Sequence, residues 1–368
     1  MTARSMSRSE ARDPTSRKTK SMKIRRTSIA LAVLGALLIA GAVVLRFVVA
    51  PSASKLPANL DAVSHFSGTG TLMNPTAFQS GDLARAIAKD VPVTVEQHIR
   101  VAQTRGDTAV LDVTITVRGP GGLEVPAKYT YALNRSTMDP ATPPDGVKVD
   151  MHTGYVGAFP PNLAADGKYS FYDAFTARAY PMNFLASSRV SDRDALVYTV
   201  DAAGAVADPG LLRALPPALP KAAVAQLAAM QAGGGSALSP EQVAGMPDLV
   251  PVQYRAQTDY GFSLDKTLSM PLGGSLKQQI VANVDVAGHP TPLLPVMAVD
   301  VQLDPKDVAH AVGQAKTAAR LLMAISELLP AALAVAGLVL IVIAVIRRKP
   351  RDEGPVKPAS STAVGAEV

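Results

Sequence analysis

Apolar and polar residues alternate along several short stretches in the middle of the chain. In residues 91–101, valine and isoleucine fill most odd positions and polar side chains fill most even positions. The same period of two returns in residues 109–117 and 123–133, and more briefly in 147–151. Because alternate side chains of a strand point to opposite faces, this pattern predicts short antiparallel strands with one buried face.

Turn-forming residues separate these stretches. The tripeptide Arg105-Gly106-Asp107 lies between the first two, and the run Gly119-Pro120-Gly121-Gly122 precedes the third. The tripeptide also spells an integrin-binding sequence, but glycine and aspartate are the residues that a hairpin turn favours. We therefore expect a hairpin at this point.

Later parts of the chain predict further strands and three helices. Alternation returns in residues 196–200, 252–260 and 297–303. The predicted helices begin near Pro220, at the capping box of Ser239 and at Asp304-Pro305. We expect the strands at 91–101, 109–117, 123–133 and 252–260 to share one sheet. The helices after Pro220 and Asp304, together with the aromatic residues 155–180, would cover its apolar face.

Two long apolar segments lie near the ends of the chain. Residues 27–49 contain one charge, Arg46, and residues 328–346 contain none. At about 1.5 Å per residue, either segment is long enough for a membrane's hydrocarbon layer of about 30 Å. The alternative for the first segment is a cleaved signal peptide, but its apolar stretch is longer than such peptides use. We expect a retained anchor, with Arg46 near the far interface.

The basic residues of the chain gather outside these two segments. Residues 1–26 hold nine Lys and Arg against two acidic side chains, and Arg347-Arg348-Lys349 follow the second segment directly. Because positive charge marks the cytoplasmic side, both termini are predicted to be cytoplasmic in a two-pass protein of the plasma membrane. The expected order is a tail (1–26), a span (27–50), an outer domain (51–327), a span (328–346) and a tail (347–368). The fold class is α+β: a mainly antiparallel β outer domain between N- and C-terminal transmembrane helices.

Composition narrows the chemistry further. The chain has no cysteine, which excludes disulfides, thiolate nucleophiles and cysteine-ligated metals. The net charge of +6 belongs to the two tails, so the body is mildly acidic and nucleic acid is not an expected partner. The sequence carries no nucleophile elbow, phosphate loop or dinucleotide fingerprint. We therefore predict no enzymatic activity, no catalytic residue and no cofactor.

The histidines give little support for a metal site. The five histidines are scattered, with no pair at helical spacing. His98 and His152 fall at polar positions of separate predicted strands and could meet across the sheet. A solvent-facing pair is favoured over a metal site, because no cluster of carboxylates completes a ligand set.

Aromatic side chains are concentrated in one segment of the chain. The chain has nine tyrosines and eight phenylalanines, and residues 155–180 hold four of the tyrosines and three of the phenylalanines. Tyr169, Phe171, Tyr172 and Phe175 are the candidate ligand-binding residues, which would flank an apolar groove or tunnel. The alternative is that they belong to an ordinary core.

The block from Phe159-Pro160-Pro161 through Gly167-Lys168-Tyr169 to Tyr172-Asp173 resembles the signature of the actinobacterial porin PorA family. That family's signature usually ends in Trp-Asp, where this chain has Tyr172-Asp173. A later segment, Ser269 to Gly274, keeps the family's proline and glycine but lacks its acidic residue and threonine. The resemblance implies a membrane-anchored protein and a role in a pore. The plan of two terminal spans around a β-rich domain is also similar to that of the CD36 scavenger-receptor family, which carries hydrophobic ligands.

Two functions follow as expectations, and a hydrolase facing the envelope is kept as a third alternative. In the first, the chain is a non-enzymatic envelope protein that binds a lipid, a glycolipid or another envelope component through its outer domain. In the second, it is a component of a porin or transport assembly. Two spans without a polar stripe cannot line a water-filled pore within a single chain, so the first function is preferred. The ligand, the oligomeric state and the pathway stay open.

Overall fold

The computed structural model describes residues 26–74, 77, 86–231 and 238–347. The chain divides into two compact units. One unit combines Met1–Val49 with Ile325–Val368, and the other is Ala50–Ala324. The basic tails and the glycine run that follows the helix after Pro220 lie outside the described residues.

The first unit contains two apolar helices. Helix α1 (Arg26–Val44) packs against α9 (Leu329–Ile346). The two candidate membrane spans have mean hydropathies of 2.7 and 2.9, and most of their side chains are exposed. Exposed leucines and valines are unfavourable in water but suit contact with lipid tails. The helices are thus long and apolar enough for a membrane protein.

Each apolar helix is flanked by a short π-helical turn. These turns are η1 (Leu45–Val49) and η4 (Ala324–Leu328). The Arg46 guanidinium in η1 donates a hydrogen bond of 2.7 Å to the carbonyl of Ser326 in η4. The residue four positions after Ser326 is Pro330, which has no amide hydrogen to donate, so the Ser326 carbonyl is available as an acceptor. The charge at the end of the first apolar segment is therefore bonded to the turn that precedes the second segment.

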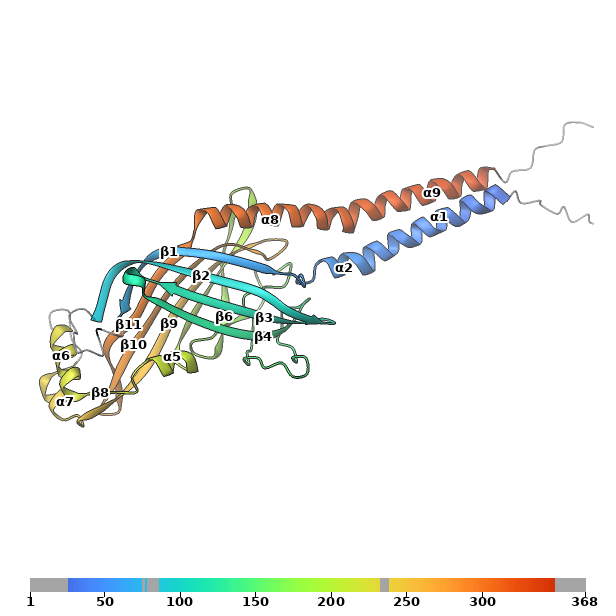
Figure 1. Ribbon diagram of the computed structural model, residues 1–368. Helices are drawn as coiled ribbons and strands as arrows, with labels where there is room; N and C mark the ends of the chain where they lie inside the picture. The colour runs from blue at the N-terminus through green and yellow to red at the C-terminus, as the bar shows by residue number, and fades with distance from the viewer. Residues whose placement is uncertain (1–25, 75–76, 78–85, 232–237, 348–368) are drawn as a thin grey trace, which may run out of the picture. The chain divides into compact units, whose positions relative to one another are not determined.

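The second unit is built on one antiparallel sheet, which curls (Figure 1). Neighbouring strands follow the order β4-β3-β2-β1-β11-β10-β9-β7-β6-β5, and the short β8 pairs with β9 outside this path. A mainly antiparallel β domain with apolar helices near both chain ends is confirmed. The strands are β1 (Asp61–Met73), β2 (Ile87–Arg105), β3 (Thr108–Arg118), β4 (Glu124–Asn134), β5 (Tyr169–Asp173), β6 (Arg178–Val190), β7 (Arg193–Ala205), β8 (Ala218–Pro220), β9 (Leu249–Asp265), β10 (Pro271–Val286) and β11 (His289–Leu303).

The four strands expected to share one sheet do so, as β2, β3, β4 and β9. The predicted hairpin is also present, and Gly106 takes a positive φ of 60° between β2 and β3. The predicted strand at 147–151 is wrong, because this segment has no regular strand structure. Its Asp150 amide donates instead to the carbonyl of Thr130 on β4, at 2.7 Å.

The segment after β4 links the two ends of the strand order. Besides the bond from Asp150 to β4, the Tyr155 amide donates to Ser170 on β5 at 2.8 Å. The Tyr172 amide donates back to the Tyr155 carbonyl at 3.0 Å. Backbone groups at an open sheet edge must find partners, and this segment supplies them to β4 and β5. The curl of the sheet is completed by irregular backbone.

Apolar side chains fill the interior of the curl. On β9, alternate residues from Val250 to Thr258 are buried while those between them are exposed. The interior side chains pack into three clusters rather than one. Their fully buried members include Val93, Ile280, Val284 and Val224 in the first, Leu111 and Leu133 in the second, and Tyr198, Val200 and Leu264 in the third.

The helices of this unit cover different faces of the sheet. Helix α6 (Lys221–Gln231) buries Val224 and Leu227 in the first interior cluster. Helix α8 (Pro305–Met323) packs Val312 and Ala315 against Ala195 of β7, on the outer face. The expectation that both helices cover the same apolar face is therefore wrong. The short helices are α2 (Ala50–Ala53), α5 (Pro209–Ala214) and α7 (Pro240–Ala244), and α7 opens with the predicted capping box at Ser239.

Candidate functional site

The four aromatic residues proposed from the sequence are distributed over three packed clusters. Tyr169 and Phe171 pack in the third cluster, Tyr172 in the second and Phe175 in the first. The Phe171 ring lies 4.9 Å from that of Tyr260, measured between centroids. Because β5 alternates, Tyr172 points away from Phe171 and meets Tyr131 of β4 at 6.1 Å. Ligand binding by these residues stays a prediction.

A buried polar centre lies at the end of β5. Asp173 is fully buried and accepts three hydrogen bonds. The Tyr260 hydroxyl donates to its Oδ1 at 2.7 Å, and the Thr176 amide and hydroxyl donate to its Oδ2 at 2.8 and 2.6 Å. A buried carboxylate needs such donors to replace the water that it has lost. The centre therefore ties the β5–β6 turn to β9.

Asp208 lies beside this centre. Its amide and that of Ala207 both donate to the carbonyl of Phe175, at 3.2 and 2.7 Å. The Asp208 side chain is the N-cap of α5 and accepts from the Leu211 amide at 2.5 Å. A second carboxylate, only 9% exposed, is thus held next to the turn that carries Asp173.

Tyrosine hydroxyls surround the two carboxylates. Burial raises the pKa of Tyr129 far above its usual value, and the charge of Asp208 and its hydrogen bond with Tyr129 raise the pKa further. Burial likewise raises the pKa of Tyr260, with the Asp173 charge and hydrogen bond adding to the effect. Both hydroxyls therefore keep their protons at neutral pH. The Tyr129 hydroxyl is buried and has Asp208 as its hydrogen-bond partner, in a contact that is longer or less well aligned than a normal hydrogen bond.

Sequence reasoning did not find this centre. In the sequence, Asp173 only ends the aromatic block, and Tyr129 is only one position of the alternating stretch 123–133. A usable signal was the position of Asp173, which shares the strand face of Tyr169 and Phe171. A carboxylate on an otherwise aromatic face must be paired when buried.

A hollow of about 490 Å³ lies on the outer face of β7, β9, β10 and β11. Two register shifts between β10 and β11, at Ile280/Val281 and Ala282/Asn283, bend the strands there. The prolines of β11, which cannot donate to a regular ladder, fit at such bulges. Polar side chains at the hollow come from Arg255, Gln257, Gln279 and Asn283.

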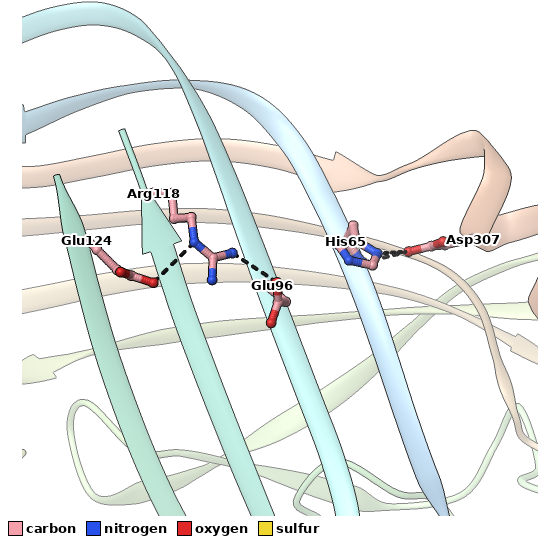
Figure 2. A network of polar contacts seen from close by, with 5 residues as sticks. All are labelled: His65, Glu96, Arg118, Glu124 and Asp307. Atoms are coloured by element: carbon pink, nitrogen blue, oxygen red, sulfur yellow. Dashed lines mark hydrogen bonds and ion pairs between the residues drawn. The ribbon is translucent and has the colours of Figure 1, made fainter. Parts of the chain in front are cut away.

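A row of charged side chains crosses the outer face of β1 to β4 (Figure 2). Arg118 bonds Glu96 at 2.9 Å and Glu124 at 3.1 Å. The hydrogen bond from Arg118 lowers the pKa of Glu96, against a smaller opposing effect of burial. These groups are largely exposed, so the row fixes neighbouring side chains more than it stabilises the fold.

The row ends at the first turn of α8. Asp307 Oδ2 accepts from the His65 amide at 2.6 Å and contacts the His65 ring nitrogen at 2.9 Å (Figure 2). Burial alone would raise the pKa of Asp307, but the bonds from His65 outweigh it and lower the pKa. Asp304 occupies the predicted N-cap of α8, yet its carboxylate accepts from the Ser67 hydroxyl instead of capping the helix. Polar contacts thus hold α8 to β1.

The two histidines that could have met across the sheet do not pair with each other. His98 Nε2 lies 2.6 Å from Asp61, whereas His152 is buried between the carbonyls of Gly154 and Ala132. Within the described ranges, no three His, Cys, Asp or Glu side chains gather as a metal site. The described residues therefore give no support for a metal site built from these side chains.

Comparison with curated protein sequences finds no match. Among solved structures, the chain is similar to a protein of Chloroflexus aurantiacus J-10-fl described as a MaoC domain protein dehydratase. The two share 11% identity over 74% of this chain and 80% of the other. Their TM-score is 0.13, so the likeness carries no argument about fold or activity.

The family described as porin PorA matches residues 27–346. This range begins within the first apolar helix, includes every strand of the sheet and ends at the last residue of α9. The resemblance drawn from the aromatic block and the terminal apolar segments is therefore confirmed. The chain is a membrane protein that belongs to the porin PorA family.

Proposed function

We propose that the chain is a two-pass envelope protein that binds a sugar-bearing, negatively charged envelope component without transforming it. Both termini are cytoplasmic and residues 51–327 face outward. The basic clusters beside the two apolar segments support this orientation. The outer hollow on β7, β9, β10 and β11 carries the binding proposal.

The polar groups of the hollow suit such a ligand. Arg255 is exposed and has no ion-pair partner among the described residues. Gln257 and Gln279 face each other across β9 and β10. Amide side chains both donate and accept, as sugar hydroxyls require, and a guanidinium pairs with carboxylate or phosphate. A glycolipid headgroup has this combination of groups.

The same side chains support binding rather than catalysis. The residues that line the hollow carry guanidinium, amide and apolar groups. None of these groups exchanges a proton near neutral pH, which a general acid or base must do. A hydrolase facing the envelope therefore has no support from this surface.

The test uses the purified full chain in detergent and oligogalacturonate, a uronic-acid oligosaccharide, with neutral dextran as the comparison. We expect calorimetric binding of oligogalacturonate that the double variant Arg255→Ala/Gln279→Ala loses. The control Arg213→Ala removes an exposed arginine from α5 and should bind normally. Equal binding by all three proteins, or release of new reducing ends, would contradict the proposal.

The family's description supports a second candidate, a component of a pore or transport assembly. Such a pore would need several copies, because the described residues of one chain include two packed apolar helices. Reconstitution of the pure protein in planar bilayers distinguishes the two functions. Stable single-channel steps would favour the pore, and an unchanged baseline would favour the binding protein.

A further inference from the structure

His152 lies in the segment that closes the curled sheet between β4 and β5, here called the seam (residues 150–155). The seam bonds β4 through the Asp150 amide and β5 through the Tyr155 amide, at 2.7 and 2.8 Å. Gly154 takes a positive φ of 89°, and a Cβ atom on it would lie 2.7 Å from the carbonyl oxygen of Ser170 on β5. Only glycine fits such a position, so the seam is built to lie close against β5.

Both ring nitrogens of His152 face carbonyl oxygens. Nδ1 lies 3.0 Å from the carbonyl of Gly154, and Nε2 lies 3.1 Å from that of Ala132 on β4. A neutral imidazole has one N–H and can satisfy only one of these acceptors, whereas an imidazolium has two and bonds both. The residue is 7% exposed, so water cannot readily replace a missing donor. The geometry of the seam therefore fits the protonated ring.

The groups that surround His152 are tyrosine rings and carboxyl groups. Tyr131 of β4 and Tyr172 of β5 lie 5.1 and 6.1 Å from the histidine, measured between ring centroids. Burial raises the pKa of both tyrosines, so both are neutral at neutral pH. Carboxyl groups from three elements act on these two rings, and they belong to Asp150 of the seam, Asp173 of β5 and Asp208 at the N-cap of α5. Negative charge close to an imidazole favours its protonated form.

We propose that His152 is a proton-operated latch that holds the seam closed. With both nitrogens protonated, the ring donates to β4 and to the seam itself. Loss of one proton leaves a buried carbonyl without its donor, which loosens the seam and exposes Tyr131 and Tyr172. Because the closed seam holds the proton, closure is favoured at acidic pH and is lost as the pH rises through the titration of histidine, between about pH 5 and pH 8.

Hydrogen exchange measured by mass spectrometry tests the latch in the full chain in detergent. After correction for the intrinsic pH dependence of exchange, we expect amide protection in the seam to fall roughly tenfold between about pH 5 and pH 8, as for one buried acceptor that loses its donor. The fall should follow the titration of His152 itself, which the slow exchange of its ring C2 hydrogen reports in the same peptide. Residues 250–258 of β9, whose alternate side chains are buried, are the internal control and should keep their protection.

His152→Gln is the matched variant, because its amide side chain does not titrate. Its seam protection should be the same at both pH values. His289→Gln changes an exposed histidine at the start of β11 and should keep the wild-type profile. Wild-type seam protection that stays constant or increases with pH overturns the proposal, whether or not His152→Gln folds. A fall that does not coincide with the titration of His152 overturns it as well. Neither outcome depends on the ligand of the outer hollow.

Discussion

Gly35 of α1 and Gly337 of α9 lie against each other, and each occupies a position where no side chain fits. A Cβ atom on Gly35 would lie 2.5 Å from the carbonyl oxygen of Gly337, and one on Gly337 would lie 2.6 Å from that of Gly35. In lipid, helices gain little from burying apolar surface and associate through close packing instead. These two glycines therefore allow the backbones of the two apolar helices to approach each other closely.

Gly35→Ala is expected to destabilise the helix pair by about 1–3 kcal/mol, because the backbone of α9 must move away. Gly41→Ala is the matched control, since a Cβ at Gly41 meets nothing within 4 Å. Alanine at Gly41 should preserve or raise stability, as it favours the helix. The measurement is the fraction of SDS needed to unfold the full chain in mixed micelles. Equal effects of the two variants would show that the glycine contact is unimportant.

The Asp265–Arg193 pair predicts how stability depends on pH. Burial tends to raise the pKa of Asp265, but the bonds from Arg193, Leu268 and Thr267 outweigh it and lower the pKa. The folded pKa thus lies below the unfolded value of about 3.9, so the pair stabilises the fold above that pH. This contribution should be lost as the pH falls through the folded pKa.

Asp265→Asn removes one partner of this buried pair and is expected to cost about 3 kcal/mol at neutral pH. Its unfolding midpoint in urea should also depend less on pH below about pH 4 than that of the wild-type protein. The control Asp194→Asn changes a carboxylate whose side chain is 70% exposed and whose contact to Arg189 is 3.7 Å. A similar loss in both variants would argue against a special role for Asp265.

Strands with strict alternation were predictable, whereas strands rich in small or polar residues were not. The stretch from Asp61 to Met73 is β1, but its many serine, glycine and threonine residues interrupt the alternation of apolar and polar positions that would predict a strand. Prolines in the first half of β11 likewise argue against a strand when the sequence is taken alone. Their strand conformation depends on neighbours: β1 pairs with β2 and β11. Such pairing is a tertiary effect that local patterns do not carry.

The polar centre was less predictable than the sheet for a related reason. Tyr129, Asp173, Asp208 and Tyr260 come from four separate parts of the chain. Each one alone fits an ordinary strand or turn position. Only the curl of the sheet, with β4 and β5 at the ends of the strand order, brings them together. A single sequence holds no signal for that closure.

Leu227→Trp tests whether α6 covers a lipid-binding cavity or belongs to the core. Leu227 is 2% exposed and packs beside the fully buried Val224. We therefore expect overpacking to destabilise the second unit by about 1–3 kcal/mol, measured by urea unfolding. The control Ala225→Trp places the same ring on the exposed side of α6. A stable Leu227→Trp protein that loses co-purifying lipid would instead support a cavity.

The proposed orientation predicts which parts of the chain a protease can reach in intact cells. Epitope tags fused before Met1 or after Val368 should be protected, because the basic clusters keep both ends in the cytoplasm. A tag inserted at Gly234 should be digested, since it follows α6 in the second unit, which the proposal places outside the membrane. Detergent-permeabilised cells serve as the control, in which all three tags must be cleaved. Detection of digested ends together with a protected tag at Gly234 would show the opposite orientation.

Cleavage of the N-terminal tag alone would indicate that α1 does not span the membrane as proposed. The tag at Gly234 also distinguishes a cleaved signal peptide from a retained anchor, because the mass of the tagged chain shows whether residues 1–50 are still attached.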